Sequence, residues 1–432
     1  MHNFLRLLLL LSSFVTVIIT GNVTCPSGFK LVNNQKCLKI FPNRLKHLEA
    51  EKDCVYLGGT LVTIKNAIDN RLITNFAAST SASSVWIGVF CFATQNSSLC
   101  YNDDETGTLN YSNFAAGNPN VGPGYGGCVY LQTTGQNVGQ WFSAPCEVVG
   151  MSYICEMPLT KLDSNCSRNY NGYCYLRSDE LQLTTFYTTY SQAQSICRSK
   201  NAELVSIHSI REISYIKAIY RDSGVSRIYL GAQSDLPDEF NWADGSNWDY
   251  DNFDPLANQT ANCLQMDLSN RADSGMWTQI SCQGSNYFLC KRRIADSMKE
   301  EMINPKFAAI QNKAPPKIRP NVFDFSQCNT TFYMAPGAIS SFGYPSPPAT
   351  HILCTWKVVS VGAYRVGLYF TDFDTSNTVY IYDERGQVLQ SPQGQLKPFS
   401  VLSPTNIVVV TYDSWNYGSY RYSGFEATVL PY

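Results

Sequence analysis

The residues with the clearest chemical potential are the cysteines and two tryptophans that precede them at a fixed spacing. Cys146 follows Trp141 by five residues, and Cys282 follows Trp277 by the same number. A further cysteine comes shortly after each of these segments, at Cys155 and at Cys290. The chain contains 16 cysteines, an even number that favours disulfide chemistry in an oxidising compartment.

The side chains that usually carry acid–base or metal catalysis form no recognisable arrangement in this sequence. Beyond the N-terminal apolar segment the histidines are His47, His208 and His351, and none lies in a motif with a serine or cysteine nucleophile. The adjacent carboxylates Asp103 and Asp104 fall in a turn-like segment, where we expect solvated side chains. The sequence has no zinc-ligand spacing and no phosphate-binding loop. We therefore expect that the protein is not an enzyme.

The elements that position these residues occur twice. Leu61-Val-Thr-Ile64 follows Cys54, and Leu204-Val-Ser-Ile207 follows Cys197 at the same spacing. Trp86-Ile-Gly then lies 32 residues after Cys54, as Tyr229-Leu-Gly lies 32 residues after Cys197. Two copies of one domain are the simplest explanation of so many matched offsets.

Each copy predicts two helices and a buried strand. In the first copy apolar spacing predicts helices over 45–57 and around 68–76, and a strand over 85–90. In the second copy the same spacing predicts helices around 190–197 and 210–219. A long segment rich in Gly, Asn and Pro precedes Cys128, and loops of this length are often functional.

The first 21 residues predict a secretory signal peptide, with a short buried helix as the alternative. Their apolar run is about 14 residues, too short for a bilayer span of about 20. No later stretch is long and apolar enough to span, so we expect a secreted, extracellular protein. N-glycosylation sequons fit that location and occur at Asn22, Asn96, Asn110, Asn165, Asn258 and Asn329.

Composition sets the remaining bounds. A length of 432 residues predicts about three domains, and a hydrophobic content of 44% allows sizeable cores. The formal charge of −2 gives no electrostatic reason to expect a nucleic-acid partner. We divide the chain into a signal peptide (1–21), a first repeat (22–158), a second repeat (159–293), a linker (294–326) and a third domain (327–432).

The linker is rich in proline and begins with the basic run Lys291-Arg-Arg293. That run predicts a solvated domain edge, with a proteolytic processing site as the alternative. The linker segment 295–312 also has a helical pattern.

The repeated frame resembles the C-type lectin-like domain over residues 25–292. The motifs that carry the resemblance are the Leu-Val-Ser-Ile segments, the Trp-Ile-Gly strand and the closing cysteines. The resemblance implies an α+β fold with small antiparallel sheets and a long loop region. It also implies the long and short disulfides of each copy, which together with local pairs give Cys25–Cys37, Cys54–Cys155, Cys91–Cys100, Cys128–Cys146, Cys166–Cys174, Cys197–Cys290, Cys263–Cys282 and Cys328–Cys354.

The third domain resembles a CUB domain, an all-β sandwich. Tyr364, Val366, Leu368 and Phe370 alternate with less apolar residues, as a strand requires. The acidic calcium signature of that family is broken, because Thr375-Ser376 stands where a Leu-Glu falls and leaves Asp413 without its partner. Two lectin-like domains followed by a CUB domain is similar to a secreted lectin-like family of nematodes.

Calcium ligands of the sugar-binding relatives are missing from both copies. Those relatives hold calcium with a Glu-Pro-Asn loop and with an Asn-Asp after the last tryptophan. Here the loops contain Asn118-Pro-Asn120 and Ala257-Asn-Gln259, and the tryptophans are followed by Phe142-Ser143 and Thr278-Gln279. Since calcium needs about 6–8 oxygen ligands including carboxylates, we expect no cofactor. A different calcium site is the alternative, and its ligands would be Asp249, Asp251 and Asp254.

The resemblance implies glycan recognition, with glycans or glycoproteins as partners in innate immunity or at surfaces. The alternative is a protein-interaction or matrix module that binds no sugar. We place the ligand surface on the first copy, where Asn118 and Asn120 offer amides, Pro119 occupies a position that is cis in calcium-binding relatives, and Tyr125 is placed to stack on a sugar. We expect Trp141 in the core. The sequon at Asn258 predicts weaker binding by the second copy.

Overall fold

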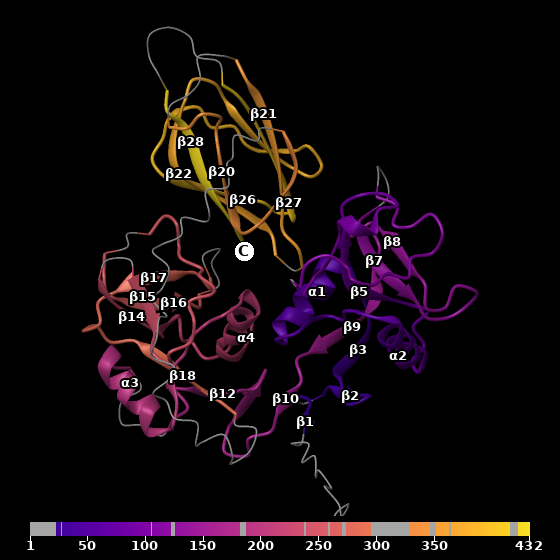
Figure 1. Cartoon of the computed structure of the whole chain (residues 1–432), viewed down its shortest axis with the longest axis horizontal. Coiled ribbons are helices and arrows are strands. Elements are labelled where there is room, and N and C mark those ends of the chain that lie inside the picture. Colours follow the sequence, from indigo (N-terminus) through magenta and orange to yellow (C-terminus); the bar gives the residue numbers. More distant parts are fainter. Residues whose placement is uncertain are drawn as a thin grey trace, which may run out of the picture.

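The computed structural model shows three packed parts (Figure 1). It describes residues 23–294 and 329–432, apart from residues 27, 105, 122–125, 182–186, 237–238, 258–259, 270–273, 346–350, 363 and 415–421. The predicted signal peptide and nearly all of the predicted linker therefore lie outside the described residues. The predicted fold class, two tandem α+β repeats followed by an all-β sandwich, is confirmed.

The first repeat is built on an eight-stranded sheet whose path is β2-β3-β9-β5-β7-β8, with β4 and β6 paired at its side. The last strand, β9, pairs antiparallel with β3 and parallel with β5. It therefore joins the β2–β3 hairpin to the rest of the sheet. The strands are β2 (Lys30–Val32), β3 (Lys36–Leu45), β4 (Thr60–Leu61), β5 (Ser84–Cys91), β6 (Cys100–Asn102), β7 (Cys128–Gln132), β8 (Trp141–Ala144) and β9 (Met151–Met157).

The second repeat has the same topology, with the path β11-β12-β18-β14-β16-β17. Its strands are β11 (Arg168–Tyr170), β12 (Tyr173–Arg177), β13 (Glu203–Leu204), β14 (Arg227–Leu236), β15 (Glu239–Trp242), β16 (Cys263–Asp267), β17 (Trp277–Ile280) and β18 (Tyr287–Arg293). A short antiparallel pair, β1 (Val23–Thr24) with β10 (Thr160–Lys161), ties the start of the first repeat to the entry of the second.

The four predicted helices are present. They are α1 (His47–Tyr56), α2 (Ala67–Ala78), α3 (Tyr190–Ser199) and α4 (Ile210–Tyr220), and a 3-10 turn covers Ser97–Leu99. The side chain of Asn66 accepts a hydrogen bond from the backbone N–H of Asp69 at the start of α2, and Ser209 does the same for Glu212 in α4. These caps explain why the two helices begin where they do.

The C-terminal sandwich consists of two five-stranded sheets, β19-β21-β27-β23-β24 and β20-β28-β22-β25 with β26 beside β22. Its strands are β19 (Thr330–Met334), β20 (Gly337–Ser340), β21 (Leu353–Val359), β22 (Val366–Thr375), β23 (Val379–Asp383), β24 (Val388–Gln390), β25 (Gly394–Gln395), β26 (Phe399–Leu402), β27 (Ile407–Asp413) and β28 (Gly424–Pro431). Alternate side chains of both sheets fill one core around Trp356, Phe370 and Phe425.

Seven disulfides connect described cysteines, and they are the seven pairs that the sequence led us to expect there. The two longest loops they close run from Cys54 to Cys155 and from Cys197 to Cys290. In the entropic account each such closure stabilises the fold by about 4 kcal/mol. The pair Cys328–Cys354 stays a prediction, because Cys328 lies outside the described residues.

The two repeats share an apolar interface. Tyr170 and Tyr215 of the second repeat stack at 3.8 Å between ring centroids, and both lie against Gly58 of the first repeat. The Tyr170 hydroxyl donates a hydrogen bond of 2.8 Å to the Gly58 carbonyl. Figure 1 shows α1 and α4 on the sides of the repeats that face each other.

Two expectations about charged side chains are wrong. Asp103 and Asp104 are not solvated, since they are only 3% and 9% exposed where the repeats and the sandwich meet. Lys291 is buried as well, because β18 carries it into the sheet and Glu212 pairs with it at 2.6 Å. In both cases tertiary packing covers a segment that looks exposed in isolation.

Within the described residues, no helix is long and apolar enough to cross a membrane.

The Tyr170 contact generates a stability prediction. Tyr170→Phe keeps the stacked ring but leaves the buried Gly58 carbonyl without that donor, so we expect a loss of about 1 kcal/mol and a lower Tm. Differential scanning calorimetry of the secreted protein measures it. Tyr173→Phe is the matched control, because it removes a hydroxyl from a half-buried tyrosine on the adjoining strand. Equal melting temperatures for Tyr170→Phe and wild type would contradict the assignment.

Candidate functional site

The long loop of the first repeat is tied to the sheet by Ser143, the second residue after Trp141. The Ser143 backbone N–H donates to Asn118 Oδ1 at 3.1 Å. Its hydroxyl donates to the Asn120 carbonyl at 3.1 Å and accepts from the Asn120 N–H at 2.7 Å. The loop that holds calcium in sugar-binding relatives is therefore closed here by direct protein hydrogen bonds.

The predicted ligand residues differ in how much bonding capacity they retain. Asn118 is half-buried and spends its side-chain oxygen on Ser143, and Pro119 is buried with its carbonyl accepting from the Gln95 N–H at 2.6 Å. The Asn118–Pro119 peptide bond is cis. Asn120 is half-exposed, and no hydrogen bond among the described residues involves its side-chain amide. Tyr125 lies outside the described residues, so the structure brings only three of the four predicted side chains together.

In the second repeat, the second residue after the tryptophan also hydrogen-bonds the long loop. Gln279 is the second residue after Trp277, and its Oε1 accepts a hydrogen bond of 2.8 Å from the Ala261 N–H in the long loop. Thr278 accepts from Gln265 within the sheet. The sequence predicted that these positions lack carboxylates but did not predict that they bind the loop. A polar side chain at the same place in both copies was the signal available.

The loop acidic residues do not gather into a metal site. Asp249 Oδ1 lies 2.7 Å from His208 Nδ1. Asp254 Oδ1 accepts a hydrogen bond from the Leu256 N–H. Over the described part of the chain, no three His, Cys, Asp or Glu side chains are grouped closely enough to hold a metal ion. The alternative calcium site at Asp249, Asp251 and Asp254 therefore finds no support in the arrangement of these residues.

Trp141 and Trp277 belong to the core, as expected for Trp141, and both are 0% exposed. Each tryptophan holds the long loop through its backbone. The Trp141 N–H donates to the Asn113 carbonyl and its carbonyl accepts from the Ala115 N–H, at 2.9 and 3.0 Å. Trp277 makes the same pair of bonds with Asn252 and Asp254, at 2.8 and 2.9 Å.

One cluster in the second repeat brings together the residue types of a hydrolase triad. His208 lies 2.7 Å from Asp249, and its Nε2 is 3.1 Å from the hydroxyls of both Ser206 and Ser246. Both hydroxyls donate instead to Asp244, at 2.5 and 2.6 Å. In this arrangement both serine hydroxyls donate to Asp244 and not to His208.

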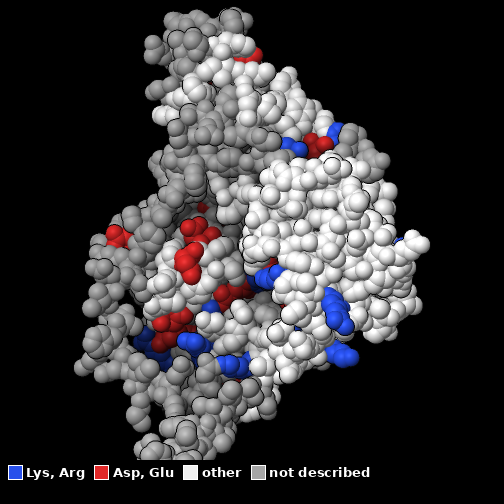
Figure 2. Space-filling view, turned by 45° about the vertical axis from the view of Figure 1, so that its right-hand side comes forward, with Lys and Arg blue, Asp and Glu red and all other residues white. Residues whose placement is uncertain are grey.

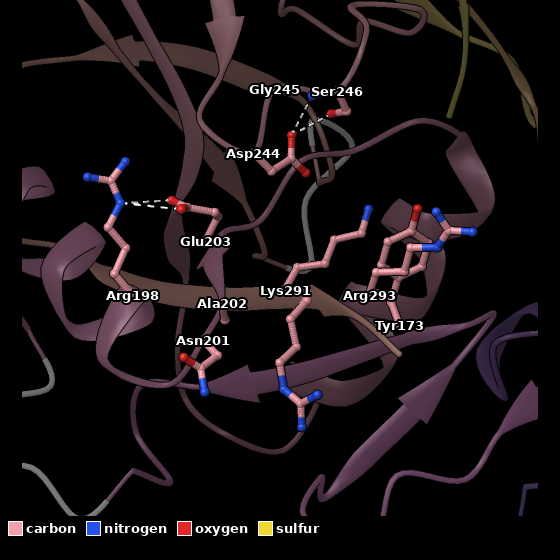
Figure 3. Close-up of a pocket in the computed structure, with 11 residues that line it drawn as sticks. Tyr173, Arg198, Asn201, Ala202, Glu203, Asp244, Gly245, Ser246, Lys291 and Arg293 are labelled. Atoms are coloured by element: carbon pink, nitrogen blue, oxygen red, sulfur yellow. Dashed lines mark hydrogen bonds and ion pairs between the residues drawn. The ribbon is translucent and has the colours of Figure 1, made fainter. Parts of the chain in front are cut away.

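A cavity of about 510 Å³ lies beside this cluster on the second repeat (Figure 3). Its walls carry several cations, but Arg198 pairs with Glu203 and Arg292 pairs with Asp163. Lys291, in the centre of the view, is held by Glu212. A neighbouring cavity of about 540 Å³ shares Lys291 and reaches the first repeat at Pro158. Several of the charges that line this region are therefore paired with one another.

The face of the molecule seen in Figure 2 also carries charges of both signs. Figure 2 shows acidic and basic side chains mixed in and around the hollow between the parts, while much of the remaining described face carries neither. The part of the chain described on this face therefore presents no patch of a single charge sign.

Sequence comparisons agree with this architecture. The Lectin C-type domain family matches residues 43–157 and 187–292, and the CUB domain family matches residues 328–429. C-type lectin domain-containing protein 38 of Caenorhabditis elegans is 36% identical over 277 residues, which cover 64% of this chain and 69% of that protein.

More distant relatives are much longer proteins. Lymphocyte antigen 75 of Mus musculus is 26% identical over 57% of this chain but only 14% of its own length. The human secretory phospholipase A2 receptor is 23% identical over 56% of this chain and 17% of its own length. Among solved structures, the cow carbohydrate-recognition domain of CD23 is 25% identical with a TM-score of 0.27, covering 31% of this chain and 96% of that chain.

The two matched lectin segments include both copies of the loop that Ser143 and Gln279 close, and the matched CUB segment is the C-terminal sandwich. The chain therefore belongs to the C-type lectin domain family, with two such domains followed by a CUB domain.

Proposed function

We propose that this protein is secreted and binds glycans through its C-type lectin domains without calcium, in innate immunity or in recognition of surface glycans. The observation that carries the proposal is the hydrogen-bonded closure of the long loop by Ser143, with Gln279 in the equivalent role. Neither the lectin nor the CUB family is in general a family of enzymes. The boundaries 22–158, 159–293 and 327–432 are part of this proposal.

Calcium independence follows from the chemistry of the loop. A calcium ion requires about 6–8 oxygen ligands with carboxylates among them. At the Ser143 position a hydroxyl occupies the place of a carboxylate, and it already bonds Asn120. The Asn118 oxygen is likewise engaged by Ser143. The loop thus has its shape without the ion, and it lacks the negative charge that would attract one.

The proposed ligand surface is the first domain's loop, with Asn118, Pro119, Asn120 and Tyr125. The Asn120 amide offers two donors and an acceptor, and the Asn118 amide nitrogen retains its donors. Hydrogen bonds of this kind to a sugar replace bonds to water, so each contributes little net free energy. We expect affinity near millimolar per site, about −4 kcal/mol, unless several sites engage together.

Secretion and glycosylation are supported by exposure. The sequon asparagines that the structure describes, Asn96, Asn110, Asn165 and Asn329, are all exposed. Asn22 and Asn258 lie outside the described residues. Disulfide bonds at this density fit an oxidising extracellular space.

A protein-binding module remains the second candidate. The names of the matched relatives include both a mannose receptor and a phospholipase receptor, so the family includes proteins named for a sugar and for a protein. The glycan-array experiment below distinguishes the two candidates.

The first prediction concerns calcium. We expect neither heat of binding nor a Tm shift when the secreted protein is titrated with calcium in the micromolar range, because a ligand that binds only the folded state would raise Tm. The triple variant Asn118→Glu, Phe142→Asn and Ser143→Asp restores the ligand types of calcium-binding relatives and serves as a positive control. A calcium-dependent Tm rise in wild type would contradict the proposal.

The second prediction concerns the loop itself. Ser143→Ala removes the hydroxyl that bonds Asn120, so we expect a loss of about 1–2 kcal/mol and faster hydrogen exchange at the Asn120 amide. The exposed Ser112→Ala is the matched control within the same loop. If the Asn120 amide exchanges equally in both variants, the closure does not depend on Ser143.

The third prediction concerns the ligand. On a glycan array the secreted protein should bind weakly, and the double variant Asn118→Ala with Asn120→Ala should lose most of the signal. Asn75→Ala, an exposed position on α2, is the matched control. Undiminished binding by the double variant would move the site elsewhere. No binding to any glycan by wild type would favour the protein-interaction function.

A further inference from the structure

The point where all three domains meet contains two carboxyl groups that water does not reach. Glu51 on α1 is 1% exposed, and Asp103 in the loop after β6 is 3% exposed. Glu51 accepts hydrogen bonds from the Thr60 hydroxyl at 2.6 Å and the Leu61 N–H at 2.5 Å. Asp103 Oδ1 accepts from Gly362 N–H of the CUB domain at 3.3 Å.

The other two domains supply the cover of these carboxyls. Gly362 approaches both, since a Cβ placed there would lie 3.1 Å from the Asp103 carbonyl and 3.8 Å from Glu51 Oε1. Two residues later, the Tyr364 hydroxyl lies 2.8 Å from the Ser214 hydroxyl on α4. Val359 and Ile407 of the CUB domain complete an apolar cluster with the first lectin domain. The CUB domain and α4 therefore add to the cover that the first domain's own Thr60 and Leu61 give Glu51.

The charges around this junction do not balance. Asp104 is served by its own partners, because Lys65 lies 3.1 Å from its Oδ2 and Thr106 donates to its Oδ1. That leaves Arg211, at the start of α4, as the cation that faces both Glu51 and Asp103. Asp103 Oδ2 and one Arg211 Nη atom are buried without a hydrogen-bond partner among the described residues. With Glu51, Asp103 and Asp104 ionised, these carboxylates face two cations of the described residues, Lys65 and Arg211, which leaves one negative charge in excess.

His47 does not supply the missing positive charge. Its Nε2 lies 3.6 Å from Asp103 Oδ2 and 3.1 Å from the Ile87 carbonyl, and the ring is 1% exposed. A neutral ring with its proton on Nε2 satisfies the Ile87 carbonyl. Burial lowers the pKa of His47 to about 4, although the bond to Ile87 opposes that change. The ring therefore stays neutral under the conditions in which the carboxyls titrate.

Burial acts in the opposite direction on the acids. It raises the pKa of Glu51 to about 7, against the hydrogen bonds from Thr60 and Leu61 and the charge of Arg211. Burial, followed by the nearby charge of Glu51, also raises the pKa of Asp103 well above its usual range. For Asp104 burial raises the pKa, but Thr106, Arg211 and Lys65 together lower it overall. The excess charge thus resides on Glu51 and Asp103.

We propose that the three domains dock as one body while Glu51 and Asp103 hold protons, and that ionisation of these carboxyls separates the domains. A carboxyl that is easier to protonate in the docked state favours docking most fully below its undocked pKa. For Glu51 this stabilisation declines as pH rises from its usual 4.5 to about 7, and it is absent above that value. The docked arrangement is therefore the acidic form, and the separated form exposes α1 and α4.

The test uses the full secreted chain at about pH 5, near the lower end of this window, and at about pH 8, above it. Small-angle scattering should give a larger radius of gyration at the higher pH. Hydrogen exchange, corrected for its intrinsic pH dependence, should accelerate in α1 and α4 but not in β22. Only the part of the Glu51 pKa shift that docking itself causes changes the docking equilibrium, so the full shift from 4.5 to about 7 sets an upper limit on the order of a hundredfold.

Two variants isolate the charge. Asp103→Asn keeps an oxygen for the Gly362 N–H but cannot ionise, so this variant, in which only Glu51 still titrates, should separate less than wild type at the higher pH. Arg211→Gln removes the facing cation and should separate at lower pH than wild type. Glu426→Gln in β28 changes the net charge equally without touching the junction and should behave as wild type.

Two outcomes would overturn the proposal. One is a wild-type protein whose scattering and exchange are the same at both pH values, a result that needs no variant to fold. The other is an Asp103→Asn protein, folded by circular dichroism, that separates with pH as wild type does. Neither outcome bears on glycan binding, so the docking proposal stands or falls independently of the proposed function.

Discussion

The backbone hydrogen bonds of Trp141 and Trp277 are the constraint on which each lectin domain depends. Each tryptophan lies at the start of a strand, fills the core with its ring, and grips the long loop from both of its backbone groups. A loop of that length has no regular structure to satisfy its own peptide groups, so a fixed partner is required. The cysteine five residues later then joins the following turn to the strand that pairs beside it. Loop shape is thereby set from the core outward.

The residue that comes two positions after the tryptophan decides how the loop is completed. A carboxylate there would need a cation to offset its charge, whereas Ser143 and Gln279 bond the loop directly. In the proposed function this exchange replaces the calcium ion, and it consumes polar atoms that an ion would have shared with a sugar. Among the described residues the Asn120 side-chain amide has no hydrogen-bond partner, so the binding proposed for the first site would rest on weak, neutral hydrogen bonds.

The sequence predicted those features that depend on local pattern or on repetition. The helices α1 to α4 follow from apolar spacing. The long and short disulfides of each copy follow from the family resemblance, and the remaining described pairs were expected as local ones. The loop closure by Ser143 was missed, because a serine signals no particular partner until the fold brings Asn118 and Asn120 beside it. Asp103 and Asp104 were placed in solvent, because the elements that cover them lie more than a hundred residues away along the chain. Lys291 was misplaced for the same reason, since its partner Glu212 belongs to α4.

The helix α4 carries charged residues that face both its own domain and the neighbouring ones. The charged residues that we wrongly expected in solvent, Asp103, Asp104 and Lys291, all interact with side chains of α4. That helix carries Arg211, Glu212 and Ser214. Glu212 turns inward to Lys291 and Tyr175, where the pairing is complete. Arg211, one residue earlier, turns toward the first domain, where the pairing is incomplete. The stability of a buried ion pair with equal opposite charges does not depend on pH while both groups stay charged. Where buried carboxylates outnumber the cations, stability does depend on pH, because burial favours the neutral form of an acid. The helix α4 thus contributes a complete ion pair, Glu212 with Lys291, to its own domain. Toward the first domain it contributes Arg211, and in the proposal the charge there is balanced only when Glu51 and Asp103 are protonated.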